Sequence, residues 1–142
     1  MSLALLKNSD LSGVYFLPAP RRAAIEAACH RLHFKALTAD IAEYSSAEQV
    51  LYQLGSALDF PIWYGANFDA LFDCLTDPDW LPAKGHVLLV CGFSRLRTAD
   101  PDDFARLIEV FKAAAEARRD MQSPLWILID SPARGVTTFP EA

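Results

Sequence analysis

Two patterns of apolar and polar positions alternate along the chain and predict an α/β fold. Short apolar runs bounded by glycine or proline are typical of strands, and apolar residues three or four positions apart are typical of amphipathic helices. The runs predict strands at residues 13–18, 34–40, 85–93 and 124–130. The spacings predict helices at residues 20–33, 45–60 and 100–119, and a further helix that begins at Phe68.

The predicted order, β-α-β-α-α-β-α-β, favours a mainly parallel sheet with helical crossovers. We expect a single α/β domain in which helices pack on a small sheet of three or four strands. Residues 34–130 form its core, and residues 1–33 add an N-terminal β-α extension to the same domain. Residues 131–142 form a C-terminal tail with turn residues and little pattern, and we expect its end to be mobile.

Polar residues mark the start of three predicted helices. An N-cap side chain accepts a hydrogen bond from a free backbone N–H of the first helical turn. The residues placed to do this are Ser45 or Ser46, Asn67 and Asp100. Pro101 suits the first helical position, because the N–H that proline lacks would have no helical partner there.

Length and composition exclude several classes of protein. The 142 residues fit one domain, and a hydrophobic fraction of 52% is ample for a core. No segment reaches the roughly 18 apolar residues of a membrane span, and the N-terminus lacks the signals of a secretory leader, so we expect a cytoplasmic protein. Cys29, Cys74 and Cys91 are widely spaced in apolar surroundings and are expected to act as core hydrophobes. With three histidines they make a poor metal set, so we expect no metal or cofactor.

Negative charge is concentrated in the middle of the chain. Residues 36–83, the acidic segment, hold eight Asp and Glu residues and no Lys or Arg, so their formal charge is −8. The rest of the chain holds all 13 basic residues and the other 10 acidic ones, so its formal charge is +3. The acidic segment would repel nucleic-acid phosphates and attract a cationic partner. A solubilising acidic surface is the alternative explanation.

The stretch WYGANFDALFDCLTDPDW, residues 63–80, combines acidic and aromatic residues on a predicted helix. At about 100° per residue, one side of this helix collects apolar residues and is expected to face the core, while the other side faces solvent. The core-facing residues are Phe68, Leu71, Cys74 and Leu75. The solvent-facing residues are Asp69, Phe72, Asp73 and Thr76.

The two aspartates differ in how well a helix accounts for them. Asp69 lies in the first turn, where the helix dipole stabilises a carboxylate by about 0.3–1 kcal/mol. Asp73 lies a turn further along, where this effect has faded and repulsion from Asp69 costs about 0.2–0.5 kcal/mol. Asp73 therefore lacks a local structural explanation and is the stronger functional candidate.

Aromatic residues surround the aspartates. Phe72 is expected to project between the carboxylates toward water, where a polar residue would be usual. Its aromatic neighbours Trp63, Tyr64 and Trp80 suggest an exposed patch. Trp63 and Tyr64 can also be explained as a partly buried cover for the core.

Three chemistries could use this helix. A metal site needs more converging ligands than two aspartates one turn apart, even if Asp77 or Asp79 contributed. A hydrolase that used Asp69, Asp73 and His86 lacks a nucleophile–base set. Recognition fits best, because two carboxylates framed by aromatics and a hydroxyl suit a partner surface that presents Arg, Lys or His.

The same stretch resembles the signature of the barstar family, which runs approximately Y-Y-G-x-N-x-D-A-L-W-D-C-L-T followed by a Trp. Members of that family are intracellular inhibitors of small secreted guanyl-specific ribonucleases such as barnase. The resemblance extends by pattern from Phe34 to Asp130. It implies a barstar-like fold and a non-enzymatic inhibitor or immunity protein whose partner is a basic secreted ribonuclease or ribonuclease toxin. It leaves the identity of that nuclease and the oligomeric state open.

The resemblance also implies roles for single residues. By position, Asp69 and Asp73 enter the nuclease active site in place of RNA phosphates, and Asp73 is the central anchor. Thr76 is a hydrogen-bonding neighbour. Trp63 replaces a tyrosine that packs on the catalytic histidine of the nuclease, and Phe72 replaces a contacting tryptophan. The full set of expected partner-binding residues is Trp63, Tyr64, Gly65, Asn67, Asp69, Phe72, Asp73, Thr76 and Trp80.

Departures from the family pattern keep an alternative open. Ala113 stands where the family often carries a glutamate that reaches the nuclease, and Ala66 replaces an acidic loop residue. Extra residues are inserted between Thr76 and Trp80. The alternative is a barstar-fold module that binds another basic protein without inhibiting a nuclease.

Overall fold

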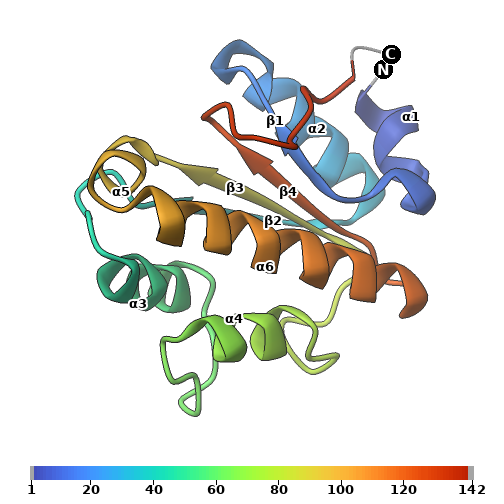
Figure 1. The fold of residues 1–142 in the computed structure, drawn as a ribbon. Coiled ribbons are helices and arrows are strands. Elements are labelled where there is room, and N and C mark those ends of the chain that lie inside the picture. Colours follow the sequence, from blue (N-terminus) through green and yellow to red (C-terminus); the bar gives the residue numbers. More distant parts are fainter. Residues whose placement is uncertain (1, 141–142) are drawn as a thin grey trace.

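The computed structural model describes residues 2–140 and shows a four-stranded sheet with helices on both faces (Figure 1). The strands are β1 (Val14–Phe16), β2 (Lys35–Asp40), β3 (His86–Cys91) and β4 (Leu125–Ile129). They lie in the order β1-β4-β3-β2, and every pairing is parallel. The predicted α/β fold class and small parallel sheet are confirmed.

Six α-helices accompany the strands within residues 2–140. They are α1 (Ser2–Lys7), α2 (Arg22–Leu32), α3 (Ala47–Ala57), α4 (Phe68–Leu75), α5 (Ser94–Ala99) and α6 (Pro101–Asp120). Two short 3-10 helices, η1 (Ser9–Leu11) and η2 (Ala19–Arg21), flank β1. The four predicted helices correspond to α2, α3, α4 and α6. The pattern did not predict α1 and α5, because six residues are too few for a helical period to show.

The two faces of the sheet build two separate cores, because successive side chains of a strand point to opposite faces. Leu88, Val90 and Ile127 join the larger core with α3, α4, α5 and α6. Leu89 and Trp126 join the smaller core with α1 and α2. The continuous apolar runs of β3 and β4 are therefore those of strands covered on both faces, as the sequence predicted.

The N-caps observed for α3 and α6 are among those predicted. The Ser46 Oγ atom accepts a hydrogen bond from the Gln49 N–H at 3.3 Å, so Ser46 rather than its neighbour is the cap. An Asp100 carboxylate oxygen accepts from the Asp103 N–H at 3.1 Å, and Pro101 is the first residue of α6. These bonds satisfy N–H groups that have no partner inside the helix.

The C-terminal tail packs along β1, which its sequence did not predict. Thr138 bridges to β1, and Phe139 is fully buried in the smaller core. Arg21 donates hydrogen bonds to the carbonyl oxygens of Phe139 and Pro140. We also predicted mobility at the end of the tail, and the last residues of that end, 141–142, lie outside the described residues.

Two of the three cysteines are core residues, as the sequence predicted. Cys29 and Cys74 are buried, whereas Cys91 is only half-buried and lies outside the core; all three thiols are free. In the part of the chain that the structure describes, no helix has both the length and the apolar character needed to cross a membrane.

Candidate functional site

Helix α4 begins at a sharply turned loop. Ala66 has a φ of 52°, in the left-handed region that is costly for a residue with a side chain. Asn67 caps the helix, because its Oδ1 atom accepts a hydrogen bond from the Ala70 N–H at 2.7 Å. A Cβ atom on Gly65 would lie 3.1 Å from the Asn67 side chain, so glycine leaves room for this cap. The loop and the cap together fix the direction of α4.

Helix α4 has a buried and an exposed side, as predicted. Its buried residues are Leu71, Cys74 and Leu75, with Phe68 half-buried beside them. Asp69 and Asp73 are both exposed.

Phe72 corrects one expectation, because it does not project largely into water. It is half-buried and packs against the larger core. At about 100° per residue, Phe72 lies roughly 40° around the helix from Phe68 and so borders the buried stripe.

A hollow of about 540 Å³ lies beside the exposed side of α4. Its lining residues are Trp63, Gly65, Asn67, Phe68, Asp69, Ala70, Asp73 and Arg106. We call it the acidic hollow. The structure therefore brings together five of the predicted partner-binding residues, namely Trp63, Gly65, Asn67, Asp69 and Asp73.

Both carboxylates of the acidic hollow lack a close basic partner within residues 2–140. The ion pairs shorter than 4.0 Å in that part of the chain are Arg22–Glu26 and Lys112–Glu109. Burial raises the pKa of the Cys74 thiol to about 11, and the negative charges of Asp77 and Asp73 contribute to this increase. Asp69 and Asp73 are therefore available to a cation from outside the chain.

Arg106 is the member of the acidic hollow that sequence reasoning missed. Its guanidinium carbon lies 4.7 Å from the centre of the Phe68 ring, which is a cation–π contact. Helix α6 carries Arg106 and packs against α4. This neighbour comes from tertiary packing between distant segments, which no local pattern encodes.

Aromatic side chains beside the hollow have two different roles. Trp63, which lines the hollow, is 54% exposed, and Ile62, its neighbour in the sequence, is fully exposed. Tyr64 is half-buried and donates its hydroxyl proton to the Leu51 carbonyl oxygen at 2.7 Å. Burial raises the pKa of Tyr64 well above its usual range. A Cβ atom on Gly55 of α3 would lie 2.5 Å from the Tyr64 ring, so this close approach requires glycine.

Two further predicted partner-binding residues, Thr76 and Trp80, are engaged within the chain itself. Thr76 is half-buried, and its hydroxyl donates to the Phe72 carbonyl oxygen at 2.8 Å at the end of α4. Trp80 is only 4% exposed, and its Nε1–H donates to the Leu58 carbonyl oxygen at 2.8 Å. The expected exposed patch therefore excludes Trp80, because an indole whose N–H is bonded is well accommodated in a core.

The comparison with known families covers the segment that holds this site. The family model described as Barstar (barnase inhibitor) matches residues 34–130, from the residue before β2 to the residue after β4. The chain belongs to the barstar family. The family is one of inhibitors rather than of enzymes. No curated protein matches the chain.

At the C-terminal end of α4, this barstar-family chain contains a buried polar cluster that sequence reasoning missed. Arg118 donates to the carbonyl oxygens of Leu75 and Ser123 at 3.0 and 2.8 Å, and it bonds His86 Nδ1 at 2.7 Å. The other ring nitrogen of His86 bonds the Leu81 carbonyl oxygen at 2.8 Å, so the proton of the neutral ring is on Nε2. Burial and the charge of Arg118 lower the pKa of His86 to about 4. Burial also lowers the pKa of Arg118, to about 10.

The position of His86 bears on the hydrolase alternative. The structure does not bring His86 together with Asp69 and Asp73, because His86 is buried and does not line the acidic hollow. Within residues 2–140, no group of three or more His, Cys, Asp or Glu residues is arranged to hold a metal ion.

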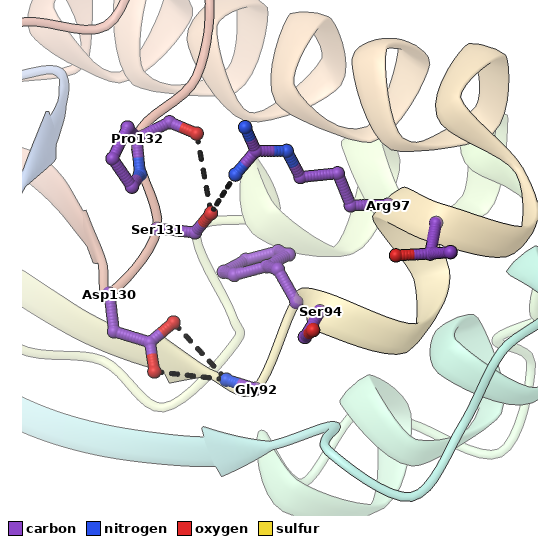
Figure 2. Close-up of a pocket in the computed structure, with 8 residues that line it drawn as sticks. Gly92, Ser94, Arg97, Asp130, Ser131 and Pro132 are labelled. Atoms are coloured by element: carbon purple, nitrogen blue, oxygen red, sulfur yellow. Dashed lines mark hydrogen bonds between the residues drawn. The ribbon is translucent and has the colours of Figure 1, made fainter.

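A second hollow of this barstar-family chain, of about 490 Å³, lies at the carboxyl ends of β3 and β4 (Figure 2). Figure 2 shows the carboxylate of Asp130 directed at the Gly92 N–H, which is 3.1 Å from each oxygen. Arg97 donates to Ser131 Oγ at 2.8 Å, and this hydroxyl donates to the Pro132 carbonyl oxygen at 3.2 Å. Although ligands often bind at this edge of a parallel sheet, the lining residues include no histidine or cysteine. These groups tie strand ends together and form no nucleophile–base pair.

Proposed function

We propose that this protein inhibits a basic ribonuclease by placing the acidic hollow against the active-site cleft of the enzyme. The observation that carries the proposal is the exposed Asp69–Asp73 pair, which has no basic group of residues 2–140 within 4.0 Å. Membership of a family of barnase inhibitors supports it. Because the protein would act on a nuclease inside the cell that makes it, the proposal includes a cytoplasmic location.

Charge mimicry explains how such a surface could block catalysis. Side chains four residues apart on a helix have Cβ atoms about 5–6 Å apart, so Asp69 and Asp73 offer two adjacent anionic groups. Arg, Lys and His residues that bind RNA phosphates would bind these carboxylates by charge-assisted hydrogen bonds. Trp63 offers an exposed flat ring that could stack on a side chain of the cleft. Inhibition then needs no reaction, because the substrate cannot enter.

The surroundings of the aspartates reduce the conformational cost of binding. Asn67 caps α4, Tyr64 ties the preceding loop to α3, and Arg118 holds the last turn of α4. A surface that is already ordered loses less entropy when a partner binds. We propose that Gly65, Asn67, Phe72 and Thr76 act in this indirect way, while Asp69, Asp73 and Trp63 contact the nuclease.

Calorimetry with barnase as the probe tests the proposal. We expect Asp73→Ala to weaken binding by at least about 30-fold, because removing one side of a buried charge pair leaves the other charge unpaired. Asp79→Ala is the matched control, since Asp79 is an exposed carboxylate of the acidic segment that does not line the hollow. Equal losses from the two substitutions, or no inhibition of RNA cleavage by the unmodified protein, would contradict the proposal.

The second candidate function is a barstar-fold module that binds another basic protein. Ala113 favours it, because this residue is exposed on α6 and offers no charge at a position where the family often has a glutamate. The distinguishing result is a basic partner without nuclease activity whose binding depends on Asp73, together with failure to inhibit small basic ribonucleases.

A further inference from the structure

Arg106 places a positive charge at the edge of a hollow that is otherwise negative. It lines this hollow together with Asp69 and Asp73, yet it lies more than 4.0 Å from both carboxylates. It is exposed, and its guanidinium is held against the Phe68 ring at 4.7 Å. The hollow therefore presents two anions and one cation, each at a separate position.

This arrangement restricts the partners that fit. A nuclease cleft that presented only cations would bring one of them close to Arg106, and like charges brought together in an interface weaken binding. A cleft that also contains a carboxylate would replace this repulsion with attraction. Within residues 2–140 the guanidinium contacts the Phe68 ring and has no carboxylate within 4.0 Å, so it can form a bidentate hydrogen bond to such a carboxylate.

We propose that Arg106 is a specificity-determining residue that pairs with a carboxylate in the cleft of the partner nuclease. This inference rests on the proposed inhibitory function and narrows the class of target. The partner is a ribonuclease whose cleft holds an Asp or Glu beside its phosphate-binding cations, as when a carboxylate serves as the general base. Nucleases that use only histidine and lysine in the cleft would be bound less well.

A double-mutant cycle with barnase as the probe tests the pairing. On this chain, Arg106→Gln removes the charge and keeps a side chain of similar reach. On the nuclease, each acidic residue of the active-site cleft is changed in turn to the matching amide. We expect Arg106→Gln to weaken binding to the unmodified nuclease by about 10-fold or more. For the amide variant that lacks the carboxylate paired with Arg106, the same substitution should weaken binding by less than about threefold. Arg106→Lys should bind more tightly than Arg106→Gln but less tightly than the unmodified protein, because lysine retains the charge but not the planar guanidinium.

Arg31→Gln is the matched control for a change in overall charge. Arg31 is exposed on α2, which packs on the opposite face of the sheet. The inference is overturned if Arg106→Gln and Arg31→Gln have equal effects, or if no amide variant of the nuclease removes the sensitivity to Arg106. In that case Asp73→Ala would still weaken binding by at least about 30-fold if the inhibitory function is correct. Loss of the Asp73 effect would instead contradict the inhibitory function.

Discussion

Tyr64 combines a half-buried ring with a hydroxyl that is hydrogen-bonded to the backbone, so removing this hydroxyl should lower stability. Tyr64→Phe removes the 2.7 Å hydrogen bond to the Leu51 carbonyl oxygen and leaves this carbonyl without that partner. We expect the free energy of unfolding to fall by about 1 kcal/mol. Urea denaturation of the two proteins measures this difference in the free energy of unfolding.

Tyr52→Phe is the control for Tyr64, because Tyr52 is 73% exposed and lies on α3, the helix that holds Leu51. Its substitution should change the unfolding free energy by less than about 0.5 kcal/mol. Equal effects of the two substitutions would show that the Tyr64 hydrogen bond contributes nothing to stability.

At the scale of residues, the sequence predicted what depends on local geometry. The exposed positions of Asp69 and Asp73 and the cap at Asn67 follow from helical periodicity and capping chemistry. Trp80 and Arg106 could not be placed in this way. Trp80 is buried by the path of residues 76–80. Arg106 reaches the hollow only because α6 packs on α4.

At the scale of elements, the polar cluster of Arg118 and His86 joins the end of α4 to β3 and α6, and it should make stability depend on pH. The pKa of His86 is about 4 in the folded protein, whereas an unperturbed histidine has a pKa of about 6.5. Between these values the unfolded chain binds a proton that the folded protein excludes, so stability is full above about pH 6.5 and falls as the pH drops. We expect a loss of about 2 kcal/mol between about pH 7.5 and pH 5.

Urea denaturation across this pH range, compared between variants, tests the role of His86. His86→Gln should flatten the dependence, even though it also lowers stability at every pH. His30→Gln, at an exposed position of α2, should leave the dependence unchanged. If the stability of His86→Gln still depends on pH in this range, other titratable groups cause the dependence.

Among the helices, predictability from sequence followed length, and the strands were marked by their apolar runs. Helices α2, α3 and α6 have 11 residues or more, and the buried strands β3 and β4 are continuous apolar runs, so each shows its period or its apolar character clearly. The six-residue helices α1 and α5 and the tail strand contact at Thr138 lack such a pattern. They are ordered by the surfaces against which they pack.

At the scale of the whole molecule, the acidic segment should steer a cationic partner. Its long-range field acts on the approach of the nuclease, so the association rate should fall as salt is added, since salt screens exposed charges. Glu43→Gln combined with Glu48→Gln should lower the association rate by about threefold at low ionic strength and leave the dissociation rate almost unchanged. Stopped-flow mixing with the nuclease measures both rates.

Two controls separate steering from contact. Asp10→Asn combined with Glu26→Gln neutralises two exposed acidic residues outside the acidic segment and should change the association rate less. Asp73→Ala should instead act mainly on the dissociation rate, because it removes a contact. Equal association rates for the two charge-neutralised proteins would argue that the position of the negative charge does not matter.

Burial of Phe139 and docking of α1 put both ends of the described chain on the sheet face away from α4 (Figure 1). A tether attached at either end would hold the protein by the sheet face opposite α4 and leave the acidic hollow exposed to solution. If the proposed function is correct, a molecule tethered in this way would keep Asp69 and Asp73 accessible to a nuclease in solution.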